Sequence, residues 1–151
     1  MPTHFSGSDD QRRALDVYIK LLRAADSVAA RALEPIHEMG LTVTQFGVLE
    51  ALWHLGSMTL SELAAKHLKS ANNLTVVVDN LEKMGLARRE RSAADRRVIF
   101  VHLTDDGAAL IKQAFPPHVA AVTQLMAILT PAEQETLDGL LRKLGKQEPL
   151  N

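Results

Sequence analysis

A chain of 151 residues, 46% of them hydrophobic and 23% charged, has the composition of a folded domain with its own apolar core. Its formal net charge of −1 does not by itself favour a nucleic-acid partner, and the absence of cysteine excludes disulfides, thiolate metal sites and thiol-based redox sensing. No apolar run reaches the roughly 18 residues of a membrane span, and residues 1–8 lack the pattern of a signal peptide, so we expect a cytoplasmic protein.

The first predicted helix runs from residue 9 to about residue 34. Its apolar residues recur at alternating steps of three and four, which forms a heptad-like stripe. The stripe consists of Leu15, Tyr18, Leu22, Ala25, Ala29, Ala32 and Ile36. Pro35 is expected to end or kink this helix near Glu34, because proline lacks the amide hydrogen that a helix uses. The small alanines would let another helix approach closely.

Two shorter helices are predicted next, and each opens with a capping box. In this motif a threonine and a Gln or Glu three residues later each accept a hydrogen bond from the other's backbone amide. Thr42 and Gln45 open the first of these helices, which ends at Gly56. Thr59 and Glu62 open the second. Apolar residues in both helices are expected to contribute to the core.

Residues 70–84 give two conflicting signals. The β-branched run from Thr75 to Val78 favours a strand. Other apolar residues follow helical spacing, and a glycine stands where a C-terminal cap belongs. Both signals favour a helix whose apolar side chains face the core. These side chains are Leu74, Val77, Leu81 and Met84. We interpret the segment as a helix that ends before Gly85.

After Gly85 the apolar period changes to two, which indicates a β-hairpin. The strands are predicted at residues 88–91 and 98–103, and the polar residues 92–96 form the loop between them. The side chains expected on the covered face are those of Ile99, Val101 and Leu103.

Two more helices are predicted after the hairpin. The first begins at residues 104–106 and is expected to bend or break at Pro116-Pro117. The second opens with the capping box of Thr130 and Glu133. The whole order predicts a mainly α protein, in which a winged helix-turn-helix with a small β-hairpin wing is flanked by N- and C-terminal helices.

The charge is distributed unevenly along the chain. Between Lys66 and Arg97 there are eight basic and four acidic residues, whereas the rest of the chain has nine basic and fourteen acidic residues. A basic centre is compatible with DNA binding, because affinity for phosphate depends on the local potential. A solvated, charged hairpin is the alternative interpretation.

The third helix of a winged helix-turn-helix enters the major groove of DNA. If its apolar side chains face inward here, its other face carries asparagines, whose paired donor and acceptor match adenine, and a valine that can meet a thymine methyl group. Short hydroxyl side chains near its start suit phosphates. The candidate DNA-binding residues of this helix are Ser70, Asn72, Asn73, Thr75, Val76, Asn80 and Lys83.

Four motifs that occur in order and at matching spacings resemble the MarR family of bacterial regulators. They are Leu-Thr-Val-Thr-Gln-Phe-Gly-Val-Leu from residue 41, Leu-Ser-Glu-Leu-Ala from residue 60, Asn-Leu-Thr-Val-Val-Val-Asp-Asn-Leu-Glu-Lys-Met-Gly-Leu from residue 73, and Asp-Arg-Arg-Val-Ile-Phe-Val-His-Leu-Thr from residue 95. The resemblance covers about residues 10–148. It implies a homodimer with intertwined first and last helices, two winged lobes on successive major grooves of double-stranded DNA, and repression that a small ligand relieves.

In this scheme residues 1–151 form a single MarR-like domain. The helices of residues 9–38 and 104–148 serve dimerisation, and residues 42–103 form the DNA-binding lobe. Asp95 and Arg97 match the family's wing motif, in which the acid orients an arginine that reaches into the minor groove, and Arg96 is expected to contact the backbone. The loop lacks the proline often found there. As an alternative, Asp95 and Arg97 form an exposed ion pair of little consequence.

The same resemblance places a ligand pocket between the dimerisation helices and the winged lobe. The candidate lining residues are Tyr18, His37, Met39, Phe46, Trp53, His54, Phe115 and His118. Apolar walls with a few polar groups suit a small aromatic or phenolic effector. Each of these residues can instead be an ordinary core residue.

Other classes of function have weaker support in the sequence. The six histidines lack the spacing of a zinc site, so we expect no metal and no cofactor, and a metal-responsive regulator with histidine ligands is kept as an alternative. A winged helix that only binds other proteins is a second alternative. No phosphate-binding glycine loop, H-E-x-x-H or G-x-S-x-G motif occurs, so we do not expect an enzyme.

Overall fold

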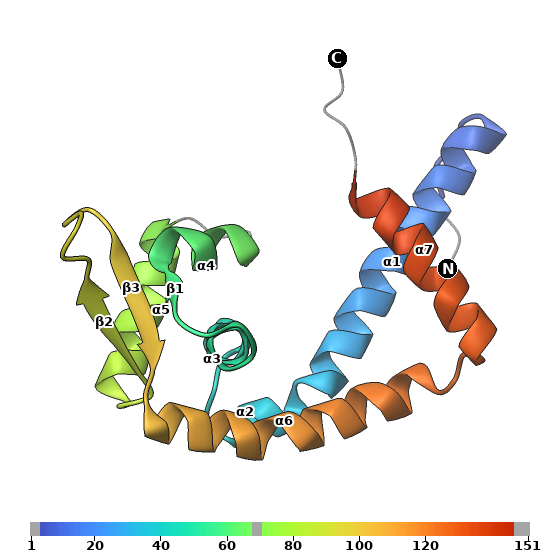
Figure 1. Cartoon of the computed structure of the whole chain (residues 1–151). Coiled ribbons are helices and arrows are strands. Elements are labelled where there is room, and N and C mark those ends of the chain that lie inside the picture. The colour runs from blue at the N-terminus through green and yellow to red at the C-terminus, as the bar shows by residue number, and fades with distance from the viewer. Residues whose placement is uncertain (1–3, 68–70, 147–151) are drawn as a thin grey trace. The chain divides into compact units, whose positions relative to one another are not determined.

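The computed structural model describes residues 4–67 and 71–146 (Figure 1). Its helices are α1 (Asp9–Ala32), α2 (Glu34–Glu38), α3 (Val43–Leu55), α4 (Leu60–Lys66), α5 (Ala71–Lys83), α6 (Asp105–Met126) and α7 (Pro131–Gly145), and its strands are β1 (Met58–Thr59), β2 (Ala87–Arg91) and β3 (Ile99–Leu103). The expected mainly α, winged helix-turn-helix fold is confirmed. The chain divides into a compact unit of residues 33–118 and a second unit made of the described parts of residues 1–32 and 119–151.

The helices begin where the capping residues predict. All three capping boxes form, with both reciprocal hydrogen bonds in each. They pair Thr42 with Gln45, Thr59 with Glu62, and Thr130 with Glu133. The expected break near Pro35 is also confirmed: α1 ends at Ala32, and α2 starts at Glu34 with the proline in its first turn, where a missing amide hydrogen costs no helical bond.

The segment with conflicting signals is a helix, α5, as the spacing of its apolar residues predicted. Leu74, Val78 and Leu81 are fully buried, and Val77 is half-buried against them. The expectation that Met84 faces the core was wrong, since 46% of this residue is exposed. Met84 lies after the last helical residue, where the chain turns at Gly85 with φ +74°, and Val78 fills the position between Leu74 and Leu81 instead.

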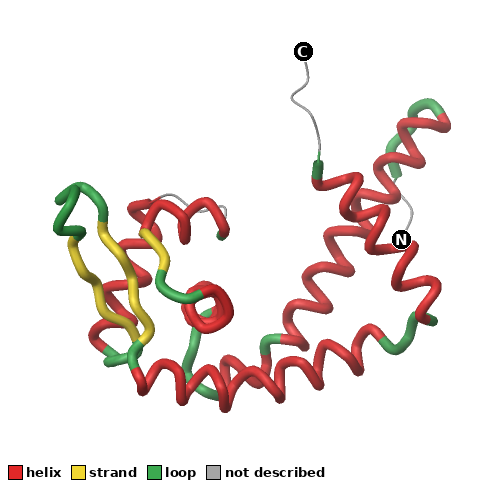
Figure 2. Tube along the Cα trace, viewed as in Figure 1, coloured by secondary structure: helices red, strands yellow, loops and turns green. Residues whose placement is uncertain are grey.

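The wing belongs to a three-stranded antiparallel sheet in the order β1-β3-β2 (Figure 2). The two strands of the hairpin agree with the prediction to within one residue, and Val101 at the centre of β3 is buried, with Ile99 and Leu103 half-buried. Strand β1 was not predicted. It has only two residues, paired with Phe100 and Val101, and such a short strand shows no alternation in sequence.

Helix α6 is not broken at its prolines. It runs from Asp105 to Met126 through both Pro116 and Pro117. Both prolines are exposed, as are Lys112 and Gln113, whose carbonyl groups lose their helical partners. Since these residues are exposed, water can satisfy the two carbonyl groups and the helix can continue.

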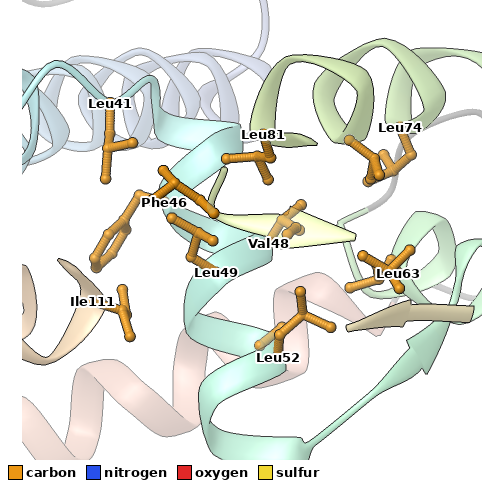
Figure 3. Close-up of a cluster of buried hydrophobic side chains, with 14 of the residues drawn as sticks. Leu41, Phe46, Val48, Leu49, Leu52, Leu63, Leu74, Leu81 and Ile111 are labelled. Carbon is orange, nitrogen blue, oxygen red and sulfur yellow. The ribbon is translucent and has the colours of Figure 1, made fainter. Parts of the chain in front are cut away.

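The core of residues 33–118 is made mainly of aliphatic side chains around α3, together with Phe46 (Figure 3). Helices α3, α4 and α5, strand β3 and the start of α6 all contribute to it. Its largest fully buried side chains are Ile36, Val48, Leu49, Leu63, Leu74, Val78, Leu81, Val101 and Ile111. This core fixes the rotation of α5 and therefore determines which side of that helix meets solvent.

The start of α6 lies directly against the turn that follows α5. Thr104 donates its hydroxyl to the Gly85 carbonyl at 2.7 Å and its amide to the Leu86 carbonyl at 3.2 Å. Gly107 is buried there, and a Cβ at this position would overlap the Leu86 carbonyl oxygen. Only glycine therefore allows this approach.

We expect Gly107→Ala to lower the free energy of unfolding by about 1–3 kcal/mol, because the backbone must shift to admit a methyl group. Urea unfolding at fixed protein concentration measures the effect. Gly139→Ala in α7 is the control. A Cβ there meets nothing within 4 Å, and alanine at a helical position should stabilise the protein by about 0.5–1 kcal/mol. Equal effects of the two substitutions would contradict the close packing at Gly107.

The second unit has almost no core of its own. Among its described residues only Ala32 is buried, although α1 and α7 carry long apolar stripes. The exposed large apolar side chains of this unit include Val17, Tyr18, Leu22, Val119, Ile128, Leu137, Leu140, Leu141 and Leu144. Over the described ranges, no helix has both the length and the hydropathy needed to cross a bilayer.

Candidate nucleic-acid interface

Helix α5 presents a polar face to solvent on the side away from the core. Asn73, Val76, Asn80 and Lys83 are exposed, and Thr75 is half-buried. Asn72 lies in the helix, but its side chain is outside the described part of the structure, as is the whole of Ser70. Four of the five predicted helix residues whose side chains are described therefore share the solvent side of α5.

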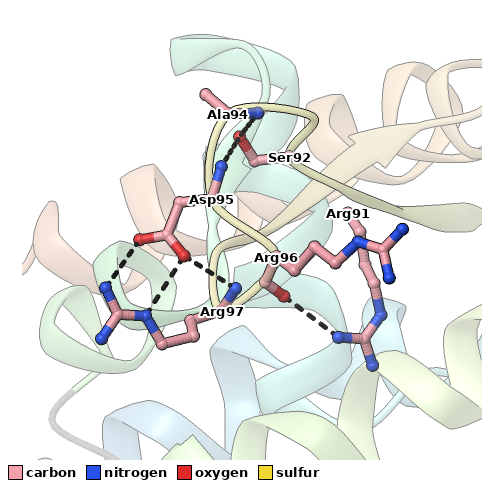
Figure 4. Close-up of polar contacts among 6 residues, drawn as sticks. All are labelled: Arg91, Ser92, Ala94, Asp95, Arg96 and Arg97. Atoms are coloured by element: carbon pink, nitrogen blue, oxygen red, sulfur yellow. Dashed lines mark hydrogen bonds and ion pairs between the residues drawn. The ribbon is translucent and has the colours of Figure 1, made fainter.

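The loop of the wing is held by backbone and side-chain hydrogen bonds (Figure 4). Ser92 Oγ accepts from the amides of Ala94 and Asp95, both at 3.3 Å. The Ser92 amide donates to the Val98 carbonyl at 2.9 Å, and the Val98 amide donates to the Asp95 carbonyl at 3.0 Å. The loop thus reaches a defined path without the proline that is often found at this place.

Asp95 and Arg97 form a bidentate pair at the tip of the wing (Figure 4). Asp95 Oδ1 accepts from Arg97 Nε at 3.2 Å and from the Arg97 amide at 3.0 Å, and Oδ2 accepts from Nη2 at 3.2 Å. The side chain of Arg97 is nevertheless 91% exposed. The acid therefore fixes the direction of an arginine that remains accessible to a partner.

The side chain of Arg97, and next its backbone amide, hold the pKa of the Asp95 carboxyl below its ordinary value through these hydrogen bonds. A lowered pKa means that the pairing is fully present above the ordinary pKa of aspartate and is lost only as the pH falls through the lowered value. The geometry of the wing is therefore constant across neutral pH.

The neighbours of Asp95 and Arg97 contribute contacts that sequence reasoning missed. The side chain of Arg91 donates to the backbone carbonyl of Arg96 at 3.0 Å, which braces the loop from within, while Arg96 itself is exposed. Ser92 acts in the same way on the other side of the loop. Neither residue type carries a distinctive signal, because the hydrogen bonds depend on the loop conformation.

A groove of about 390 Å³ joins the wing to the helix-turn-helix. Arg97 lines it together with Thr75 of α5 and with Thr59 and Ser61 at the start of α4. The structure thus brings a predicted wing residue and a predicted helix residue to one concave surface. Hydroxyl groups and a guanidinium in a groove are suited to phosphate or to base edges.

Several basic residues of the central segment are already paired with acids. Arg89 forms ion pairs with Asp79 and Glu82 of α5, and Arg88 lies 3.4 Å from Glu90. The local positive charge is therefore carried by fewer free groups than the count from sequence indicates. The sequence offers no sign of the Arg89 pairs, because they depend on how β2 lies beside α5.

The candidate ligand residues fall into three groups. Five of them form one cluster of rings on α3 and α6, made of Phe46, Trp53, His54, Phe115 and His118. Ring centroids lie 4.7 Å apart for Trp53 and His54, 5.0 Å for His54 and Phe115, and 5.0 Å for Phe46 and His118. Phe46 is buried, whereas Trp53 is 37% exposed, so the cluster reaches the surface.

The three other candidate ligand residues are Met39, His37 and Tyr18. Met39 packs against the core and His37 is exposed in α2. Tyr18 is exposed and belongs to the second unit. In the described part of the chain, no three His, Asp or Glu side chains gather as a metal site.

The chain is similar to known regulators over most of its length. Residues 32–114 match the family model described as transcriptional regulator SarA/Rot. The HTH-type transcriptional regulator MhqR of Bacillus subtilis is 35% identical to this chain over 133 residues, which are 88% of the chain and 92% of that relative.

Two solved structures show the same fold at similar levels of identity. BpsR of Bordetella bronchiseptica, whose DNA binding is regulated by 6-hydroxynicotinic acid, is 28% identical with a TM-score of 0.79, covering 98% of this chain and 100% of that one. A mutant of MarR from E. coli in complex with operator DNA is 26% identical with a TM-score of 0.81, covering 91% of this chain and 99% of that one.

Proposed function

The chain belongs to the MarR family of winged helix-turn-helix transcriptional regulators, and on this basis we propose that it is a ligand-responsive repressor that binds double-stranded DNA as a homodimer. In this proposal residues 1–151 act as one functional domain in the cytoplasm. Residues 9–38 and 104–148 serve dimerisation, and residues 42–103 bind DNA. The operator is a pseudo-palindrome with half-sites about 10 bp apart, which follows from two symmetric lobes on successive major grooves.

The observation that carries the DNA-binding proposal is the Asp95–Arg97 pair. It holds an accessible arginine beside a groove that also contains Thr75 of α5. We assign base contacts to the exposed face of α5, through Asn73, Val76 and Asn80. Ser70, Asn72, Lys83 and Arg96 remain proposed contacts. A relative of the same fold is known in complex with operator DNA, which supports this assignment.

The proposal of a homodimer rests on the second unit. Its apolar side chains on α1 and α7 remain exposed in one chain, and a groove of about 520 Å³ is lined by Val17, Tyr18, Leu21 and Leu144. Exposed apolar stripes of this length on two helices are typical of an interface. Since the same stripe occurs on both copies, a second copy of this chain is a self-complementary occupant.

Selection of duplexes from a random library, followed by binding to the winning sequence, tests the function. We expect a pseudo-palindrome and an affinity that falls steeply with salt, because phosphate contacts release counterions. If no duplex is selected and binding to DNA is weak even at low salt, the DNA-binding proposal is wrong. The alternative of a winged helix that binds only other proteins would then be favoured. The histidine-liganded alternative has no specific observation in its favour.

We place the effector at the ring cluster of α3 and α6. Its rings offer stacking surfaces, and His54 and His118 offer polar atoms for a hydroxyl or carboxyl group. A relative whose DNA binding responds to 6-hydroxynicotinic acid supports an effector that is a small hydroxylated aromatic.

Trp53 is the single tryptophan of the chain, so its fluorescence reports on this cluster. We expect 6-hydroxynicotinic acid or a simple phenol to change that fluorescence on binding. Phe115→Leu should lower the affinity for the effector by about fivefold to tenfold through loss of ring stacking. Phe100→Leu, which changes a ring outside the cluster, is the control. Equal effector affinity in both variants would rule out this location.

A further inference from the structure

Arg89 of strand β2 contacts two carboxylates of helix α5 at once. It forms an ion pair with Asp79, and its Nε donates to Glu82 Oε1 at 2.5 Å. Its backbone amide also donates to Glu82 Oε2 at 3.4 Å. All three side chains are 31% to 40% exposed, so solvent screens this cluster less than it screens the pairs elsewhere on the surface.

We propose that this cluster, which we call the Arg89 clamp (Arg89, Asp79 and Glu82), positions the wing relative to α5 and so sets the DNA specificity of the protein. This inference rests on the proposed function. Arg89 is a positioning residue in it and touches no DNA itself.

The geometry explains why a second attachment matters. Residues 84–86 connect α5 to β2, and at this point the Leu86 amide donates to the Leu81 carbonyl at 2.9 Å while both side chains are buried. The hairpin is also held through β3, which pairs with β1 and buries Val101. The clamp adds a second attachment between β2 and α5, farther along the strand, and thus fixes the direction of β2 relative to the helix that faces DNA in the proposal.

The clamp also changes the charge next to the DNA-facing residues. Asp79 and Glu82 directly precede Asn80 and Lys83 on α5. Two free carboxylates there would repel phosphates, and the guanidinium of Arg89 offsets part of their charge. Because Arg89 is engaged in this way, we expect it to contribute nothing to the number of phosphate contacts.

The shape of the arginine side chain is essential to this role. A guanidinium presents several N–H donors in a rigid plane and can hold two carboxylates in fixed directions, whereas the lysine ammonium is a point charge on a flexible stem. Arg89→Lys therefore keeps the charge and loses the fixed geometry. Arg88→Lys, at the exposed adjacent position, is the matched control.

The experiment compares the affinity of the full chain for its selected duplex and for a scrambled duplex. We expect Arg89→Lys to lower the affinity for the selected duplex by about tenfold and the affinity for the scrambled duplex by less than about twofold. Arg88→Lys should leave both affinities within about twofold of wild type. Circular dichroism at the assay temperature checks that each variant is folded. A change in the ratio of the two affinities then does not come from loss of stability.

A second variant tests whether Arg89 touches phosphate. Arg89→Gln is combined with Glu82→Gln, so that the net charge of the clamp is unchanged. The slope of log affinity against log salt should then equal that of wild type, and a slope smaller by about one would overturn the clamp. Asp79→Asn combined with Glu82→Gln should raise affinity for the scrambled duplex and lower the selected-to-scrambled ratio. If wild type binds no duplex, the proposed function fails. If wild type discriminates and Arg89→Lys discriminates equally well, only the clamp fails.

Discussion

Replacing Arg97 with alanine is expected to weaken binding to the selected duplex by about 10-fold to 100-fold, because a guanidinium that reaches a groove contributes about 1–3 kcal/mol. The slope of log affinity against log salt should fall by about one if a phosphate contact is lost as well. Fluorescence anisotropy with a labelled duplex at several salt concentrations measures both quantities. Size-exclusion chromatography should show an unchanged oligomeric state.

Arg142→Ala is the matched control for Arg97→Ala. Arg142 also forms an exposed pair with an aspartate, at 2.7 Å from Asp138, but it belongs to α7 rather than to the wing. The control should keep wild-type affinity for DNA. Asp95→Asn should give a smaller loss than Arg97→Ala, because the arginine remains but is no longer held by a charged partner. Wild-type affinity in Arg97→Ala would contradict the assignment of the wing.

Introducing a carboxylate on the apolar face of α7 should abolish the homodimer and, with it, tight DNA binding. Leu140 is 60% exposed in one chain and shares a helix face with Leu137, Leu141 and Leu144. In a dimer that buries this face, Leu140→Glu would place an unpaired charge at the interface, at a cost of several kcal/mol. Analytical ultracentrifugation should show dimerisation weakened by at least about 100-fold.

Gly139→Glu adds the same charge one residue earlier. Because successive helix residues are about 100° apart, Gly139 lies on the side opposite the leucines, and a Cβ there meets nothing within 4 Å. This variant should remain dimeric and bind DNA as wild type does. A dimer that survives Leu140→Glu would mean that α7 takes no part in the interface.

Local signals in the sequence were sufficient for most of the fold. Capping boxes, Pro35 and the spacing of Leu74 and Leu81 are short-range features, so the helix starts and the assignment of α5 followed from them. Features that depend on packing between distant segments were missed or wrong. Strand β1 exists only because β3 lies beside it, and Met84 is exposed because the chain turns at Gly85.

The candidate site follows the same division. The Asp95–Arg97 pair spans two residues of one loop, and a motif identifies it. The Arg89 clamp joins a helix to a strand through the turn between them, and nothing in the charge pattern distinguishes Arg89 from its neighbour Arg88. Eight candidate ligand residues were named from the sequence, and only the packing of α6 on α3 shows that five of them lie together as a ring cluster.

The hydrogen bonds between Asp95 and Arg97 also have an entropic consequence. A free arginine at a surface samples many rotamers, and fixing it in one of them costs up to about 2 kcal/mol. Here three hydrogen bonds to Asp95 restrict the side chain while the wing folds. In the proposed complex, part of the ordering cost is therefore borne by folding rather than by association, and the aspartate increases affinity for DNA without touching it.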